Sequence, residues 1–217
     1  YTTPTFDVGG GSVSFMLGYT PEAGDAATGE GGVAVQSASY GSAKTAGIKL
    51  SFAGLSAGAF GEEVENDRGE SARERNAMSA TWFANYSFGP VSVGYQTGGL
   101  DYGKATASGG TSTAATTAKT VAAATGNFEF EKMSIAFNVN ENLSLSWGEL
   151  EETYDEQSNV ASGTEIADVE MSSTSIQFAY TMGSMSIKGY QTDTDNPGWD
   201  SNAKSDEVTE LAVNFAF

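Results

Sequence analysis

The sequence predicts an all-β fold, an antiparallel up-and-down transmembrane β-barrel with about eleven strands in this chain. Three observations support this fold class. Apolar residues recur at every second position in one segment after another, the connections alternate between short and long, and no run of some 18 apolar residues is present. Because a strand places successive side chains on opposite faces, each such segment has one apolar face and one polar face.

The last stretch of the chain shows this pattern most clearly. Leu211, Val213, Phe215 and Phe217 alternate with polar or small residues. An apolar strand with an open face is an aggregation hazard in a soluble protein, whereas it is stable in a closed barrel whose apolar face meets lipid. The alternation alone is also compatible with the last strand of a soluble β-sandwich.

The same alternation locates the other strands. Met16 and Phe83 break the polarity of the polar face of their strands. Within residues 127–139 the apolar parity switches, which predicts either a β-bulge near Glu131 and Lys132 or a strand that leaves the membrane there. In chain order, strands are expected near residues 1–6, 12–19, 46–53, 57–64, 78–88, 91–96, 127–139, 143–148, 173–181, 185–188 and 210–217.

The connections between these strands are expected to alternate in length. Short turns are predicted at residues 7–11, 54–56, 89–90, 140–142 and 182–184. Long connections are predicted near residues 22–45, 65–77, 98–126, 155–168 and 193–204, and the acidic loop around the fourth is expected to run from about Glu151 to Ala167. Up-and-down barrels of the bacterial outer membrane have short periplasmic turns and longer external loops, whereas Greek-key sandwiches show no such strict alternation.

Composition excludes several classes of function. The chain has 10 Lys and Arg residues against 28 Asp and Glu residues, a net charge of −18, which argues against nucleic acid as a partner. It contains no Cys and no His, so disulfides, thiol catalysis, His-based triads and metal or haem sites built on Cys or His are excluded within it. An acidic balance favours affinity for cations or well-solvated loops.

Three features together resemble one known family. Tyr1-Thr2-Thr3-Pro4-Thr5-Phe6 is followed by a short turn and by an alternating strand that ends in Gly18-Tyr19-Thr20-Pro21. The short turns alternate with long loops, and apolar alternation ends on Phe217. These features resemble the C-terminal part of a Gram-negative general porin, loosely over the whole chain. The resemblance implies a homotrimer of barrels with about sixteen strands, in the outer membrane.

About eleven strands in one sheet would leave two free edges, which lipid does not tolerate. We therefore expect residues 1–217 to form a single barrel domain that lacks N-terminal strands and the constriction loop of the implied family. The alternative is a smaller, complete barrel of about ten or twelve strands.

The expected function is passive diffusion of ions and small hydrophilic solutes through a water-filled channel. Such a channel needs polar or charged side chains on its inner wall, and parity selects as candidates Lys49, Gln96, Lys132 and Lys188. Each is equally compatible with an ordinary lumen residue that has no selective role. A basic patch at the pore mouth is a second hypothesis for Arg68, Arg73 and Arg75, although a solvated loop of weakly paired charges is favoured.

Aromatic side chains on outward faces or near strand ends are expected to face lipid and to form girdles at the membrane interfaces. They are Trp82, Tyr86, Phe88, Tyr95, Trp147, Tyr180, Phe215 and Phe217. No cofactor is expected, except that Ca²⁺ could bind acidic external loops and bridge them to lipopolysaccharide phosphates. The weak candidates for such a site are Glu63, Asp67, Asp193 and Asp195, and simple loop solubility is favoured over it.

Two other classes of function remain open at this stage. A barrel enzyme would need a nucleophile with a base, and residues 1–217 contain no His to serve as the usual base, which would then have to lie upstream. A structural or adhesive surface β-protein would not need a lumen at all. The expected partners of the channel are membrane lipid, lipopolysaccharide, two further copies of the chain and small hydrophilic solutes.

Overall fold

The computed structural model describes residues 1–21, 40–66, 76–103, 126–155 and 167–216. These residues form eleven strands in one antiparallel sheet and one short 3₁₀-helix. The elements are β1 (Phe6–Val8), β2 (Gly11–Thr20), β3 (Tyr40–Phe52), β4 (Leu55–Asn66), β5 (Ala77–Phe88), β6 (Val91–Asp101), β7 (Asn127–Asn138), β8 (Leu143–Asp155), β9 (Val169–Met182), β10 (Met185–Asp195), η1 (Pro197–Trp199) and β11 (Asp206–Phe215).

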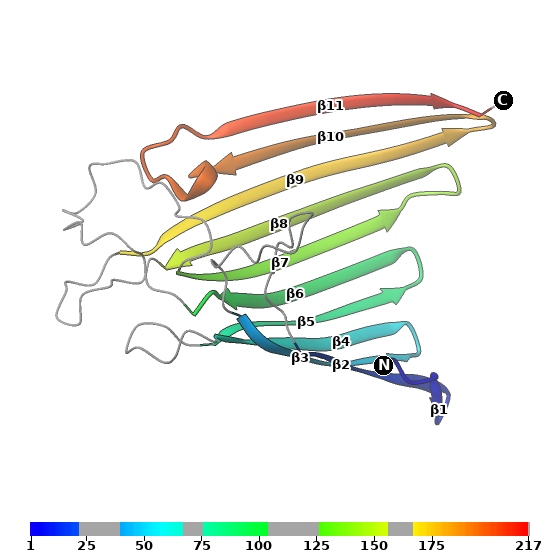
Figure 1. Ribbon diagram of the computed structural model, residues 1–217. Coiled ribbons are helices and arrows are strands. Elements are labelled where there is room, and N and C mark those ends of the chain that lie inside the picture. Colours follow the sequence, from blue (N-terminus) through cyan, green and yellow to red (C-terminus); the bar gives the residue numbers. More distant parts are fainter. Residues whose placement is uncertain (22–39, 67–75, 104–125, 156–166, 217) are drawn as a thin grey trace, which may run out of the picture.

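The strands pair in chain order from β1 to β11, each with its sequence neighbours. Figure 1 shows a curved sheet in which β1 and β11 lie at opposite edges. Residues before β1 extend the first edge, because the backbone N–H of Thr3 donates to the carbonyl of Phe15 over 2.9 Å and that of Leu17 donates to Tyr1 over 2.8 Å. The predicted all-β, up-and-down fold class is confirmed.

The short turns all lie at one end of the sheet, on the right in Figure 1, and the strand ends that border the long connections lie at the other. At Gly54 and Gly183 the backbone has φ of 86° and 59°, a left-handed conformation that glycine adopts without a steric penalty. We call the two ends of the sheet the turn end and the loop end. No helix within the described residues has the length and apolar character needed to span a membrane.

Several strands extend further toward the loop end than the sequence predicts. Glu65, predicted in a loop, lies in β4, and Glu151 and Asp193 likewise lie in β8 and β10. β9 begins at Val169 instead of Ser173. Backbone ladders continue through these polar stretches because antiparallel pairing needs no apolar side chains.

The β-bulge predicted near Glu131 and Lys132 is absent. β6 and β7 keep one register from Val91↔Phe137 through to Asp101↔Asn127. Phe128 and Phe130 therefore lie on the face opposite to Met133, Ile135 and Phe137. The switch in parity reflects a change of environment along a regular strand and not a break in the ladder.

The register divides the sheet into two faces. The face that carries Leu17, Ile48, Trp82, Ile135 and Val213 is here called the apolar face, and the other is called the polar face. The apolar face is open: its side chains are 48% exposed at Trp82, 44% at Ile135 and 49% at Val213.

Almost no hydrophobic side chain is buried. Among the described residues only Ala43 and Tyr154 form a buried hydrophobic core. Phe178 and Phe215, which a β-sandwich would enclose between two sheets, are 38% and 58% exposed. The described part of the chain is therefore a single layer, and the β-sandwich hypothesis is wrong for it.

Candidate functional site

The polar face brings three of the four predicted pore-lining residues onto one row of directly opposed positions. Lys49 faces Gly58 of β4, Gly58 faces Phe83, Phe83 faces Gln96, and Gln96 faces Lys132 of β7. Since opposed residues in a ladder point to the same face, the side chains of Lys49, Gln96 and Lys132 all project from the polar face.

Lys188 lies on the same face but in a different part of the sheet. It faces Ala179 of β9 and Ala212 of β11, whereas the row from Lys49 continues through Leu150 to Ser173. The lysines are therefore spread along the polar face and do not form one cationic cluster.

Gln96 and Lys132 share a hollow of about 360 Å³ whose lining includes Asn85, Ser134 and Ser175. The amide Nε2 of Gln96 donates to Oγ1 of Thr81 over 3.1 Å, which holds the side chain along the sheet. Amide, ammonium and hydroxyl groups in this arrangement can hydrogen-bond a hydrophilic solute or its hydration shell.

Phe83 interrupts this polar row because it covers glycine on the neighbouring strand. A Cβ placed on Gly58 would lie 2.8 Å from Cε1 of Phe83 and 3.1 Å from Cε2 of Phe60. The rings of Phe60 and Phe83 stack at 6.4 Å and 10°. Aromatic cover of a cross-strand glycine shields the exposed backbone and explains the apolar exception.

A cluster of aromatic rings occupies the loop end of the polar face, and the sequence analysis missed it. The ring of Phe128 lies 4.7 Å from Tyr154 and 5.1 Å from Trp199, with Tyr102 at 6.1 Å. Nε1 of Trp199 donates to the carbonyl oxygen of Glu152 over 3.2 Å, which ties η1 to β8. The sequence did contain a signal for this placement, because Phe128 has the same parity as Lys132 and therefore projects from the polar face.

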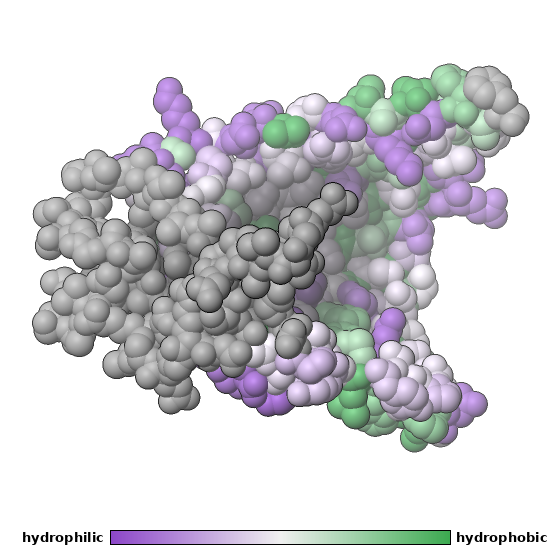
Figure 2. All heavy atoms as spheres, in the orientation of Figure 1, coloured by the Kyte–Doolittle hydropathy of each residue, from purple (hydrophilic) through white to green (hydrophobic). Residues whose placement is uncertain are grey.

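The predicted aromatic girdle residues lie on the apolar face wherever the structure describes them. Trp82 packs on Tyr95 of β6 at 5.0 Å, and Tyr86 stacks with Phe88 at 5.7 Å. Figure 2 shows hydrophobic residues gathered toward the turn end. The remaining members of this set on the apolar face are Trp147, Tyr180 and Phe215. Phe217 lies outside the described residues.

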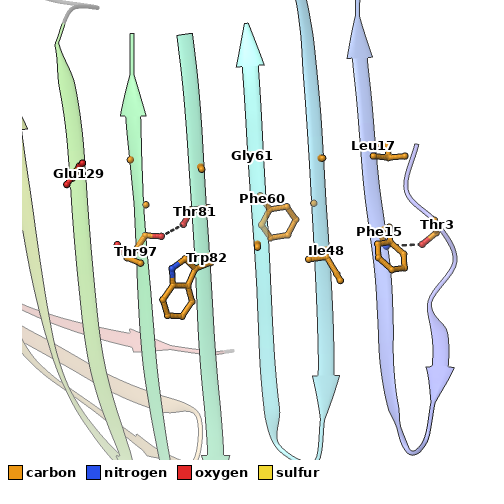
Figure 3. Close-up of a pocket in the computed structure, with 16 residues that line it drawn as sticks. Thr3, Phe15, Leu17, Ile48, Phe60, Gly61, Thr81, Trp82, Thr97 and Glu129 are labelled. Atoms are coloured by element: carbon orange, nitrogen blue, oxygen red, sulfur yellow. Dashed lines mark hydrogen bonds between the residues drawn. The ribbon is translucent and has the colours of Figure 1, made fainter. Parts of the chain in front are cut away.

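The apolar face also carries a shallow hollow of about 990 Å³ across β2 to β7. Figure 3 shows Phe15 and Ile48 on one side of it and Trp82 on the other, with Gly61 between them. Small residues on β3 to β6 form its floor, namely Ala46, Ala59, Gly61, Ala80 and Gly99. The hollow is a depression of the apolar surface, and no charged group other than Glu129 lines it.

Toward the loop end, the apolar face becomes acidic. On β7 the face carries Met133 and Ile135 nearer the turn end, and Glu131 and Glu129 nearer the loop end. The same change occurs on β8 between Trp147 and Glu149. Other carboxylates on this acidic part of the face are Glu63, Glu65, Asp101, Glu151, Glu170, Asp193, Asp195 and Glu207.

One ion pair stands in this acidic zone, beyond the apolar part of β3 and β4. Nζ of Lys44 lies 2.8 Å from Oε1 of Glu65, and Oγ of Ser42 donates to Oε2 of Glu65 over 2.7 Å. The Lys44 hydrogen bond, followed by those of Ser42, lowers the pKa of Glu65 from 4.5 to about 2. The same hydrogen bond raises the pKa of Lys44.

The calcium candidates do not assemble into a site in the described part of the chain. Within it, no group of three or more Asp and Glu side chains could hold a metal ion. Glu63 instead accepts a hydrogen bond from Nδ2 of Asn76 over 2.6 Å. Four candidates lie outside the described residues. They are the proposed calcium ligand Asp67 and the proposed pore-mouth residues Arg68, Arg73 and Arg75.

The fold matches solved porins. No protein-family model and no curated protein matches the sequence. A porin structure refined at 1.8 Å resolution aligns with 98% of this chain and 60% of its own, with a TM-score of 0.55 and 17% identity. OmpT, an outer membrane protein of Vibrio cholerae, aligns with 97% of this chain and 62% of its own, with a TM-score of 0.50 and 12% identity.

The chain spans about three fifths of the length of each of these two solved structures. The described strands make one open sheet with the order β1 to β11. The structure therefore resembles part of a porin, and the chain has the fold of a porin barrel wall.

Proposed function

We propose that this chain forms part of the wall of an outer-membrane channel through which ions and small hydrophilic solutes diffuse passively. The division of the sheet into two open faces carries this proposal. One face exposes side chains such as Trp82 and Phe178 at 48% and 38%, and the other carries Lys49, Gln96 and Lys132. A single layer with this division is stable where lipid covers one face and water fills the other.

The pore needs a closed barrel. Within the described residues, β1 and β11 each pair with one neighbour only, and unpaired backbone groups are costly in lipid. We therefore propose that further strands, N-terminal to residues 1–217, join these edges in a barrel of about sixteen strands that assembles as a trimer. Partial coverage of the solved porins supports this part of the proposal.

The side chains on the polar face supply the proposed selectivity. Lys49, Lys132 and Lys188 provide positive potential on the lumen wall, and Gln96 provides neutral hydrogen-bonding groups. The acidic zone at the loop end of the apolar face would lie at the level of the lipid headgroups. There, divalent cations between carboxylates and lipopolysaccharide phosphates would screen the repulsion of like charges.

Reconstitution into planar lipid bilayers tests the proposal. The full-length protein, refolded in detergent, should migrate faster before heating than after it on a gel and should give stepwise ohmic conductance. Lys132→Glu should shift the ratio of cation to anion permeability toward cations, whereas Glu131→Gln on the opposite face of β7 should not. Absence of conductance steps from a folded, heat-modifiable protein would refute the channel.

The alternatives predict different behaviour. A surface β-protein without a lumen would stay in solution without detergent and would not conduct. A barrel enzyme would need a nucleophile and base on the polar face, and the sequence contains no His or Cys to provide them. A surface β-protein in solution does not account for the exposed apolar face, whereas a barrel enzyme would share that face with the channel and would be distinguished by its activity and by the absence of conductance.

A further inference from the structure

The loop end of the polar face contains a second hollow, of about 710 Å³, whose chemistry differs from the rest of the proposed pore wall. Aromatic and carboxylate side chains line it together. The aromatic members are Phe60, Tyr102, Phe128, Phe130 and Trp199. The acidic members are Glu62 of β4 and Glu152 of β8, and none of the described residues that line it is Lys or Arg.

Parity places both carboxylates on the polar face. Glu62 faces Thr45 and Ser79, and Glu152 faces Phe130 and Met171. Within the described residues neither carboxylate accepts a hydrogen bond from another side chain. Both charges are therefore available to a solute in the hollow, which is large enough for a ring and an attached ammonium group.

The chain itself shows how a cation sits at the edge of this hollow. Nζ of Lys132 lies 5.1 Å from the centre of the Phe130 ring, within the range of a cation–π contact. The chain thus places an ammonium group against an aromatic ring at the edge of the hollow, on the same face of the sheet as Glu152.

The rest of the hollow also combines aromatic rings with a carboxylate, and none of the described residues that line it is a cation. Phe128 and Trp199 meet edge to face at 5.1 Å and 70°, so the cluster presents both a ring face and a ring edge. Aromatic faces carry negative charge density that attracts cations, and their area binds apolar groups. Glu62 supplies a carboxylate on the opposite side.

We infer that this hollow binds organic cations that carry an aromatic or other apolar body, such as benzylammonium compounds. The inference rests on the proposed function in that it places the site on the path of a diffusing solute. Anions with the same ring are repelled by Glu62 and Glu152, and neutral rings lack the charge interaction. The hollow would therefore raise the local concentration of such cations in the lumen.

Tryptophan fluorescence can test binding without relying on conduction. The chain contains three Trp residues, and only Trp199 lines the hollow, since Trp82 and Trp147 lie on the apolar face. The full-length protein in which every Trp other than Trp199 is replaced by Phe, Trp82 and Trp147 among them, should respond to benzyltrimethylammonium with a saturable change in emission. Benzoate at equal concentration should give no saturable change, and benzyl alcohol should bind about tenfold more weakly.

Adjacent residues on opposite faces of β8 provide a matched pair of variants. Glu152→Gln should weaken the affinity for benzyltrimethylammonium about tenfold, whereas Glu151→Gln, which projects from the other face, should leave it unchanged. Isothermal titration calorimetry on the full-length protein without Trp substitutions should give the same ranking.

Equal affinities for the cation and benzyl alcohol, or equal effects of the two glutamine variants, would overturn the inference. A folded protein that shows no binding in either assay would also overturn it. Conduction without cation binding would refute this site alone, and cation binding without conduction would refute the channel alone.

Discussion

The turn-end half and the loop-end half of the sheet carry opposite polarity on the same face. Near the turns, the face that carries Ile135 and Leu145 is apolar and exposed at 44% for each residue. Near the loops, the same face carries Glu129 and Glu151, while the opposite face carries the ring of Phe128. The backbone ladder runs through both halves without interruption between β7 and β8.

This comparison separates what the backbone requires from what the surroundings require. Antiparallel pairing continues as long as hydrogen bonds form, whatever the side chains are. The polarity of the side chains matches the medium that contacts each face of the sheet. In the proposed membrane setting, the change from Met133 to Glu131 on β7 marks the level at which lipid gives way to water.

The largest expected effect comes from a charge in the turn-end half. Ile135→Arg should lower the free energy of unfolding from lipid vesicles by about 2–4 kcal/mol, because the guanidinium would lie in hydrocarbon. Glu131→Arg, on the same face and strand, should change it by less than about 1 kcal/mol. Urea titration of the folded protein in vesicles measures both, and equal losses would mean that the two halves share one environment.

A smaller loss is expected from the aromatic cluster at the loop end. Phe128→Ala removes the contacts with Tyr154 and Trp199 and should cost about 2 kcal/mol, at 0.5–1.5 kcal/mol per aromatic pair plus burial. Amide hydrogen exchange should become faster at Gly198, Trp199 and their neighbours, because η1 loses its contact with β7. Phe130→Ala is the control, and a similar effect on η1 from that variant would contradict a role for the ring cluster.

Two glycines of β4 sharpen the comparison of the faces. Gly58→Ala should destabilise by about 1–2 kcal/mol, because its Cβ would lie 2.8 Å from the ring of Phe83 on the polar face. Gly61→Ala should change stability by less than about 0.5 kcal/mol, since its nearest neighbour would be the Ser79 carbonyl at 3.7 Å. Thermal unfolding of both variants measures the difference, and its absence would show that Phe83 moves freely.

The smallest effect concerns the ion pair at the loop end. The pKa of Glu65 is lowered from 4.5 to about 2 in the fold, so its contribution to stability is present above pH 4.5 and is lost as pH falls toward 2. Lys44→Met removes the largest cause and should raise the pKa of Glu65 toward 4.5. Carboxyl ¹³C NMR titration measures the shift, and an unchanged pKa would mean that Lys44 does not hold Glu65 in solution.

The sequence was sufficient for the fold class and for the order of the strands. Period-two alternation carries this information because successive residues of the turn-end half project to opposite faces of the sheet, one apolar and one polar. The strand ends were predicted less well. Glu65, Glu151 and Asp193 were predicted in loops, because polar residues on both faces remove the alternation while the hydrogen bonds continue.

The candidate site was only partly accessible from the sequence. Parity placed Lys49, Gln96 and Lys132 on one face, and the register added that they share a row. The cluster of Phe128 with Trp199 was missed because its members are far apart in the chain and meet only when η1 folds onto the polar face. The parity switch near Glu131 allowed either a bulge or a strand that leaves the membrane, since both disturb parity in the same way, and the unbroken register excludes the bulge.

One measurement tests the central claim most directly. Residues 1–217 contain no Cys, so single cysteines can be introduced at Met133, Ser134, Ile135 and Ala136 of β7 in a protein whose remaining residues carry no Cys. They are then labelled with a nitroxide in the vesicle-embedded protein. Oxygen accessibility should be high at positions 133 and 135 and low at 134 and 136, with the opposite order for a water-soluble nickel chelate. Four labels that are all accessible to the chelate, or all shielded from both reagents, would contradict a sheet with lipid on one face and water on the other.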